Sequence, residues 1–140
     1  MNLAISTSLH TSFEDAVART REALAQHGFG VLTEIDVKAT LKAKLGHDME
    51  EYLILGACNP PLAHRAIESN RQIGLLLPCN VVVRTDPDRA GTVLVEAMNP
   101  ALLVEVTGEP TLRPVAEEVT GKLWAAIDSL NQSSPVAAGD

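Results

Sequence analysis

The amino-acid sequence predicts an α+β fold in two layers, with a five-stranded, mostly antiparallel sheet and the element order β-α-β-β-β-β-α. Three observations predict this arrangement. Residues Leu3 to Ser8 alternate between apolar and polar, as a half-buried strand does. Two long segments repeat apolar residues at helical spacing, and several short apolar runs bounded by turn residues lie between them. We therefore expect two longer helices on one face of the sheet and short inserted helices.

The first strand, Leu3 to Ser8, is followed by a predicted helix. Thr11-Ser12-Phe13-Glu14 is typical of a capping box, with Thr11 as the N-cap and Glu14 reaching back to it. Gly28 suits the left-handed residue that ends many helices. Phe29 to Ile35 is the predicted second strand, with Phe29, Val31, Thr33 and Ile35 facing one way.

A short helix follows the second strand. Asp36 is its expected cap and Gly46 its expected end. Lys38, Lys42 and Lys44 give this helix a basic surface within an acidic protein. A solvated face is favoured over an anion-binding role for these lysines.

Three further strands are expected in the middle of the chain. Tyr52 to Ala57 is the third, and Asn59 caps a helix that starts at Pro60. Gly74 to Val83 is the fourth, interrupted by Pro78. Thr92 to Met98 is the fifth, and the turn residues before it predict antiparallel pairing with the fourth.

The C-terminal part of the chain repeats one arrangement and then closes with a helix. Asn99-Pro100 predicts an asparagine cap followed by a short helix over Ala101 to Val106. A long helix is expected from Thr111 to Leu130. Residues 1–131 are predicted to form a single domain and residues 132–140 a flexible C-terminal tail.

The composition argues against several classes of function. The chain has 140 residues, a formal net charge of -7 and 3% aromatic residues, so it should repel nucleic acids and anionic membranes. The sequence shows no secretory signal and no apolar run long enough to span a bilayer. We therefore expect a cytoplasmic protein that binds neither nucleic acid nor membrane, with reduced cysteines.

The two cysteines are the most informative residues for function. Cys58-Asn59 ends the predicted third strand, and Cys79-Asn80 lies inside the predicted fourth. A thiol at a helix N-terminus has a lowered pKa, which makes it a better nucleophile and metal ligand. Asn99 begins a helix in the same way as Asn59. These observations make Cys58, Asn59, Cys79, Asn80 and Asn99 the candidate ligand-binding residues.

A metal site is one interpretation of the cysteines. If Cys58 and Cys79 converge with His64 or Met98, the set would suit a soft ion such as zinc or copper(I). The spacing matches no zinc motif. Thiol-based redox or sulfur-handling chemistry is a second interpretation, with Cys79 as the resolving partner of Cys58.

Two alternatives assign the cysteines no metal-binding or redox role. In the first, both cysteines are small buried residues of the core. In the other, a small apolar ligand lies between the sheet and the helices, lined by Leu75, Leu76, Leu77, Gly56 and Ala57. No catalytic residue is assigned, because the chain has neither a nucleophile elbow nor a glycine-rich phosphate loop.

The third to fifth strands are apolar on both faces, so the sheet face without long helices needs a cover. The short helices or a second subunit would supply it, and a homodimer is favoured.

Four segments of the chain together resemble the family called domain of unknown function 302. They are Asp36-Val37-Lys38-Ala39-Thr40-Leu41-Lys42, Leu55-Gly56-Ala57-Cys58-Asn59-Pro60, Leu77-Pro78-Cys79-Asn80-Val81 and Met98-Asn99-Pro100. The resemblance runs from about Leu3 to Leu130 and implies a TATA-binding-protein-like (TBP-like) fold and dimers. It implies no DNA binding, because fold does not determine function. The last segment has Asn99-Pro100 where the family more often has Asp-Pro.

The sequence therefore predicts a small-ligand or metal-binding, or sensing, module centred on Cys58 and Cys79. The alternative is a thiol-based redox or sulfur-handling protein. An enzymatic activity is the less favoured expectation.

Overall fold

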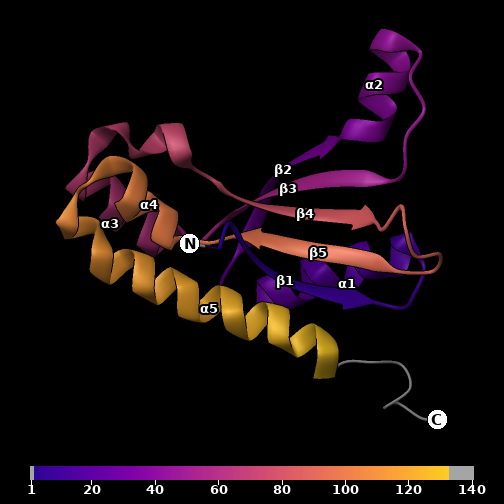
Figure 1. Ribbon diagram of the computed structural model, residues 1–140. Helices are drawn as coiled ribbons and strands as arrows, with labels where there is room; N and C mark the ends of the chain where they lie inside the picture. The colour runs from indigo at the N-terminus through magenta and orange to yellow at the C-terminus, as the bar shows by residue number, and fades with distance from the viewer. Residues whose placement is uncertain (1, 133–140) are drawn as a thin grey trace.

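The computed structural model describes residues 2–132 and confirms the α+β fold with its five-stranded antiparallel sheet (Figure 1). The elements, in chain order, are β1 (Ala4–Leu9), α1 (Phe13–Gln26), β2 (Gly30–Asp36), α2 (Val37–Leu45), β3 (Tyr52–Cys58), α3 (Pro60–Ser69), the 3-10 turn η1 (Arg71–Leu76), β4 (Cys79–Thr85), β5 (Val93–Met98), α4 (Ala101–Thr107), the 3-10 turn η2 (Pro110–Leu112) and α5 (Arg113–Gln132).

The sheet has the strand order β1-β5-β4-β3-β2, and every neighbouring pair is antiparallel. β5 pairs with β4 across the Asp86–Thr92 turn, as the sequence predicted. The N-terminal strand β1 forms the edge of the sheet farthest from β2, where Ala4 pairs with Met98 of β5. β1 and β2 are therefore the two edges.

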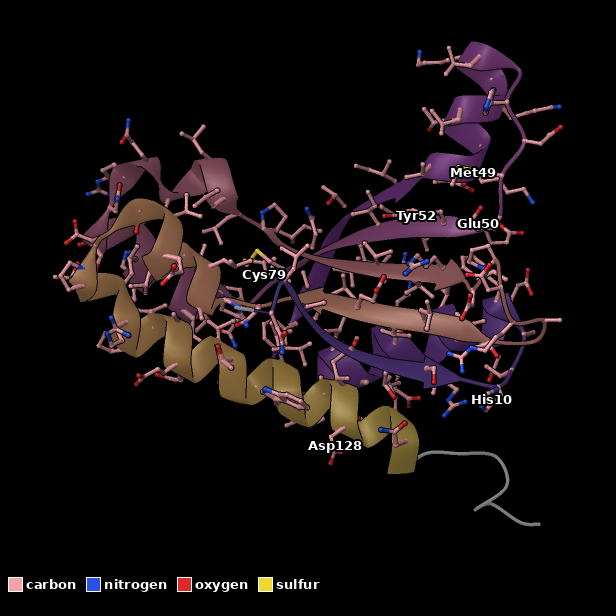
Figure 2. The ribbon with its side chains drawn as sticks, in the orientation of Figure 1. His10, Met49, Glu50, Tyr52, Cys79 and Asp128 are labelled. Carbon is pink, nitrogen blue, oxygen red and sulfur yellow. The ribbon has the colours of Figure 1, made fainter. Side chains whose placement is uncertain are left out.

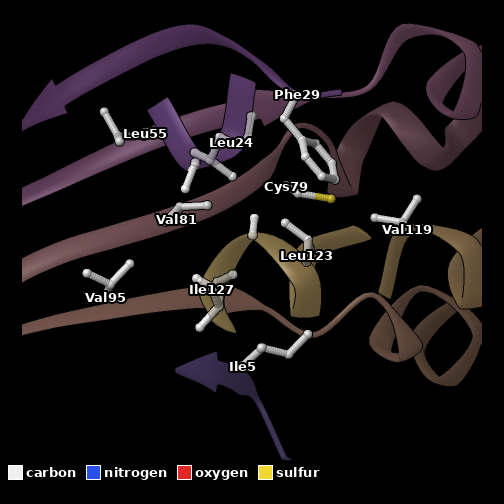
Figure 3. Close-up of a cluster of buried hydrophobic side chains, with 14 of the residues drawn as sticks. Ile5, Leu24, Phe29, Leu55, Cys79, Val81, Val95, Val119, Leu123 and Ile127 are labelled. Atoms are coloured by element: carbon white, nitrogen blue, oxygen red, sulfur yellow. The ribbon is translucent and has the colours of Figure 1, made fainter. Parts of the chain in front are cut away.

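The two longer helices, α1 and α5, lie together on one side of the sheet, also as predicted (Figure 1). Strand residues that face these helices alternate with residues that face away, which is the period-2 pattern of a half-covered sheet. On β5, for example, Val93, Val95 and Ala97 are buried and the residues between them are not. The core lies between the sheet and these helices (Figure 3).

The opposite side of the sheet is called the open face here. It is defined by the outward side chains of all five strands, which cross-strand pairing places side by side. These side chains are half-buried or exposed, in contrast to the buried core side. The open-face residues are Ser6, Ser8, Thr33, Ile35, Tyr52, Ile54, Asn80, Val82, Arg84, Leu94, Glu96 and Met98.

Helix α2 stands apart from the rest of the molecule, at the end of β2 and β3 (Figure 1). Its boundaries are those predicted. The Asp36 carboxylate accepts a hydrogen bond from the Ala39 N–H at 2.9 Å, and Gly46 ends the helix with a φ of 66°. None of its residues is buried. Helix α3, η1 and α4 gather at the opposite end of the sheet.

The predicted start of the first helix is wrong by one residue. Ser12, not Thr11, is the N-cap, because its hydroxyl accepts the Asp15 N–H at 3.1 Å. Thr11 instead donates its hydroxyl hydrogen to the Asp15 carboxylate at 2.7 Å. The capping box with Glu14 is therefore not formed, although a hydroxyl side chain still caps the helix.

The predicted facing of the second strand is also wrong. Phe29 is buried and Val31 pairs with the core-facing Ala57, but the register shifts between Val31 and Thr33. A bulge of this kind changes the side to which the following residues point. Thr33 and Ile35 consequently lie on the open face.

The fourth strand starts later than predicted. Residues Arg71–Leu76 form a 3-10 turn, which Asn70 caps through the Gln72 N–H, and β4 begins only at Cys79. Pro78 has no N–H to give to a strand ladder, so it lies before the strand rather than inside it. Leu75 is 82% exposed as a result.

The C-terminal helices differ from the prediction at their ends. Pro100 occupies the N-cap position of α4, yet Asn99 still accepts the Ala101 N–H at 3.1 Å, so the asparagine keeps a capping role. Helix α5 runs from Arg113 to Gln132 after a 3-10 turn. Of the predicted tail, residues 133–140 lie outside the described part of the chain.

Candidate functional site

A small apolar cavity of about 40 Å³ lies at the end of the sheet, among β3, β4 and helices α3, α4 and α5. Both cysteines of the chain belong to its wall. The remaining wall is apolar apart from Asn59. The lining residues are Phe29, Ala57, Cys58, Asn59, Leu62, Ala63, Ala66, Leu77, Pro78, Cys79, Leu103, Val115 and Val119.

Cys58 is placed by the junction between β3 and α3. It is the last residue of β3 and pairs with Gly30 of β2. The next residue, Asn59, caps α3 by accepting the Leu62 N–H at 3.2 Å, and Pro60 begins the helix. Cys58 therefore lies beside the N-terminus of a ten-residue helix, where the helix dipole favours negative charge.

Cys79 enters the cavity from the first position of β4. It pairs with Ala57 and so points to the core side of the sheet. Its side chain is only 5% exposed. Figure 3 shows its sulfur near the Phe29 ring and on the side of Val119, and both of these residues also line the cavity.

The buried position of Cys79 changes the acidity of its thiol. Burial, with a smaller contribution from the neighbouring Cys58, raises the pKa of the Cys79 thiol from its ordinary value of 9.0 to about 11. Cys79 is therefore protonated at neutral pH and is a poor nucleophile. Both cysteines are free thiols.

The other residues proposed from the sequence do not reach this cavity. Asn80 follows Cys79 but is exposed on the open face. Asn99 donates from its amide to the Asn2 carbonyl at 2.9 Å, which ties the N-terminal segment to the start of α4. The structure thus brings together Cys58, Asn59 and Cys79, and leaves Asn80 and Asn99 elsewhere.

The two extra metal ligands considered from the sequence, His64 and Met98, do not line the cavity. His64 is on the outer side of α3, 75% exposed, with its Nε2 3.8 Å from the Glu68 carboxylate. Met98 lies in the β1–β5 ladder opposite Ala4. Within residues 2–132, no three His, Cys, Asp or Glu side chains are grouped so as to hold a metal ion.

Sequence reasoning missed the far wall of the cavity. Leu103 of α4 and Val115 and Val119 of α5 complete it. No sequence signal tells which strand end these helices cover. Of the apolar lining proposed from sequence, Leu77 and Ala57 belong to the wall.

The sequence model of the family described as domain of unknown function DUF302 matches residues 5–130. The chain belongs to the DUF302 family. A crystal structure of an uncharacterized conserved DUF302 protein from Bacillus stearothermophilus is similar to it, with a TM-score of 0.83 and 31% sequence identity. The alignment covers 91% of this chain and 98% of that one.

The comparison with curated proteins finds no significant match. The DUF302 family is described only as a domain of unknown function. A search of the described helices finds none that combines the length and the apolar character needed to cross a membrane.

Proposed function

We propose that this DUF302 protein is a small-ligand-binding module whose site is the cavity between Cys58 and Cys79. One observation carries the proposal: the only two cysteines of the chain come from different strands and line the same apolar cavity. The asparagines that follow the two cysteines do not share this site, since Asn59 lines the cavity and Asn80 does not.

The size of the cavity limits the ligand to a few atoms. A volume of about 40 Å³ exceeds what one water needs, but pockets for organic cofactors span roughly 300–1,000 Å³. Thiol sulfurs in an apolar wall suit a soft, thiophilic ligand. Copper(I) has this chemistry, and soft sulfur ligands select it over hard cations.

Zinc is a poorer match than copper(I). Structural zinc sites use four ligands and catalytic sites at least three from the protein. The cavity supplies two thiols, and no third His, Cys, Asp or Glu completes a set within the described residues. Two soft thiolates can hold copper(I) by themselves. The Cys79 proton must leave when the ion binds, so affinity rises with pH.

Copper(I) titration in competition with a chromophoric chelator, together with native mass spectrometry, tests the proposal. Wild-type protein should take up one copper(I) per chain, and Cys58→Ser and Cys79→Ser should each lose it. His64→Ala is the matched control and should bind normally, because that side chain is exposed and away from the cavity. Uptake that survives the double serine variant, or no uptake by the wild type, would overturn the proposal.

A thiol-based redox or sulfur-handling role is the second candidate. It is supported by the nearness of the thiols, since Cys58 contributes to the raised pKa of Cys79. In the simplest step, hydrogen peroxide oxidises both thiols to a disulfide and is itself reduced to two waters. Intact-mass measurement after peroxide treatment would detect the loss of two hydrogens. The protonated state of Cys79 makes this reaction slow at neutral pH.

The same chemistry bears on the cellular compartment. A reducing environment keeps both thiols free for a ligand, and we propose that the protein works in the cytoplasm.

A further inference from the structure

A groove of about 300 Å³ lies between helices α4 and α5, which pack against each other (Figure 1). It is called the α4–α5 groove here, and it is lined by Ala101, Val104, Glu105, Arg113, Ala116, Glu117 and Thr120. None of these residues lines the cysteine cavity. Pockets for small organic ligands span roughly 300–1,000 Å³, so this groove has room for a small organic molecule and the cysteine cavity does not.

The floor of the α4–α5 groove is apolar. Ala116 of α5 is only 3% exposed, and Val104 of α4 packs against the hydrophobic core. Ala101, the first residue of α4, adds a third small apolar side chain. A surface of this kind favours an apolar group, because contact with it removes that group from water.

Three charged side chains surround this floor: Glu105 of α4, and Arg113 and Glu117 of α5. Arg113 and Glu117 are four residues apart, so they lie on the same face of their helix. Within residues 2–132, none of the three side chains makes an ion pair or a hydrogen bond. Thr120, the other polar residue, already donates its hydroxyl hydrogen to the Ala116 carbonyl at 2.7 Å. The groove therefore offers one unpaired guanidinium and two unpaired carboxylates.

We propose that the α4–α5 groove binds a free α-amino acid with an aliphatic side chain. The Arg113 guanidinium donates parallel hydrogen bonds to the carboxylate of the ligand, because its planar fork of N–H donors matches that group. The ammonium group of the ligand donates to the carboxylates of Glu105 and Glu117. The aliphatic side chain covers the apolar floor.

The charges of the groove favour a zwitterion over a ligand of one sign. An anionic ligand would pair with Arg113 but would be repelled by the two carboxylates. A simple amine would pair with a carboxylate but would leave the guanidinium without a partner. An α-amino acid carries a carboxylate and an ammonium group on the same carbon, so one small ligand complements both signs. The chain charge of -7 also disfavours nucleotides and other polyanions.

The groove and the cysteine cavity are separate sites that share a helix. Val115 of α5 lines the cavity, and Ala116, the next residue, lines the groove. Figure 2 shows the Cys79 sulfur at the end of the sheet where β4 begins. The inference therefore does not rest on the proposed copper(I) site. A variant with both Cys58→Ser and Cys79→Ser should bind the amino acid as tightly as the wild type.

Isothermal titration calorimetry of the full chain with L-leucine and L-valine tests the inference. At least one of them should bind with one molecule per chain. Isopentylamine lacks the carboxylate of leucine, and N-acetyl-L-leucine lacks its ammonium charge, so each should bind at least about tenfold more weakly than L-leucine. The inference is overturned if neither amino acid binds at millimolar concentration, or if either analogue binds as tightly as L-leucine.

Substitutions of the charged side chains locate the site. Arg113→Gln and Glu117→Gln each remove a charge at an exposed position, so the variants should fold and should bind L-leucine at least about tenfold more weakly. Glu118→Gln is the matched control on the same helix, since Glu118 lies outside the groove and pairs with Arg65 at 2.8 Å. Circular dichroism reports whether each variant is folded. Wild-type affinity in folded Arg113→Gln and Glu117→Gln, or an equal loss in Glu118→Gln, would show that the ligand binds elsewhere.

Amide chemical shifts give an independent location. In two-dimensional proton–nitrogen NMR spectra, L-leucine should shift the amide signals of residues 101–105 and 113–120, which line the groove or adjoin it. The same spectra of the double cysteine variant should show the same shifts. Changes confined to the strands or to α2 would overturn the inference.

Discussion

Arg84 and Glu96 form a double hydrogen-bonded ion pair across neighbouring strands, in the middle of the open face. The Arg84 Nε donates to one carboxylate oxygen at 2.7 Å and its Nη2 to the other at 3.3 Å. The hydrogen bond with Glu96 raises the pKa of the Arg84 guanidinium above its ordinary value. A paired charge of each sign therefore lies beside Val82 and Leu94 on an otherwise apolar part of the surface.

Removing one member of this pair should lower the stability of the protein. We expect Arg84→Ala to reduce the free energy of unfolding by about 1–2 kcal/mol, because Glu96 keeps its charge but loses both hydrogen bonds. Urea denaturation measures the change. Arg71→Ala removes a more exposed pair with Glu68 and should change stability by less than ~0.5 kcal/mol. Equal losses in the two variants would contradict this expectation.

Gly56 should not tolerate a side chain. A β-carbon there would collide with the Thr33 hydroxyl and lie 2.8 Å from the Pro78 ring, so Gly56→Ala should destabilise the protein by about 1–3 kcal/mol. Gly30→Ala is the control on the neighbouring strand, where a β-carbon meets no atom within 4 Å. It should be neutral or slightly stabilising. Thermal melting of the two variants compares them directly, and a stable Gly56→Ala protein would show that Thr33 and Pro78 can move aside.

The raised pKa of Cys79 predicts a loss of stability in alkaline solution. Between pH 9 and about pH 11 the unfolded chain releases the Cys79 proton while the folded chain keeps it. The unfolded state then binds fewer protons, so this thiol lowers the free energy of unfolding by about 1.4 kcal/mol per pH unit. Below pH 9 the thiol is protonated in both states and has no effect.

The comparison of two alanine variants isolates this effect from other groups that titrate at high pH. Cys79→Ala should flatten the alkaline slope of stability against pH, and Cys58→Ala should largely retain it. Urea denaturation at a series of pH values measures both. An unchanged slope in Cys79→Ala would mean that the thiol titrates near its ordinary pKa in the folded protein.

The wall of the cavity should be sensitive to truncation. Leu62 is 3% exposed, so Leu62→Ala should lower the free energy of unfolding by about 2–4 kcal/mol through lost packing and an enlarged cavity. Leu75→Ala removes the same atoms from an exposed position and should stay within about 0.5 kcal/mol of wild type. Chemical denaturation of the pair gives the answer. A small loss for Leu62→Ala would indicate that α3 and α5 move together to fill the space.

Much of the fold could be predicted because it depends on local patterns. The alternation along β1 and the helical spacing of α5 are each visible within a short window of sequence. The start of β4 could not be predicted in this way. Gly74 to Leu77 is as apolar as a strand, and only the cap at Asn70 and the ring of Pro78 make it a 3-10 turn. The bulge after Val31 depends on pairing with β3, which no local pattern reports.

The candidate site was predictable in part. Cys58 and Asn59 are adjacent in sequence, and the strand-to-helix junction between them was visible. Cys79 lies beside Cys58 and Asn59 only because β4 pairs with β3 in the register that places Cys79 opposite Ala57. Asn80 is the next residue of the same strand, so its side chain points to the opposite face of the sheet. The likeness of the two Cys-Asn pairs in sequence therefore does not survive as a likeness in space.

The pairing of Ala4 with Met98 has a consequence for how the protein is made. A ribosome releases β1 before the other four strands, yet the strand that β1 needs as a neighbour is β5, the last strand of the sheet. During synthesis β1 must wait until β5 has left the exit tunnel, because no earlier strand adjoins it. Closing so long a loop is slow compared with forming a local hairpin. The nascent chain can assemble β2, β3 and β4 in order, and β1, although translated before them, is among the last strands to be paired.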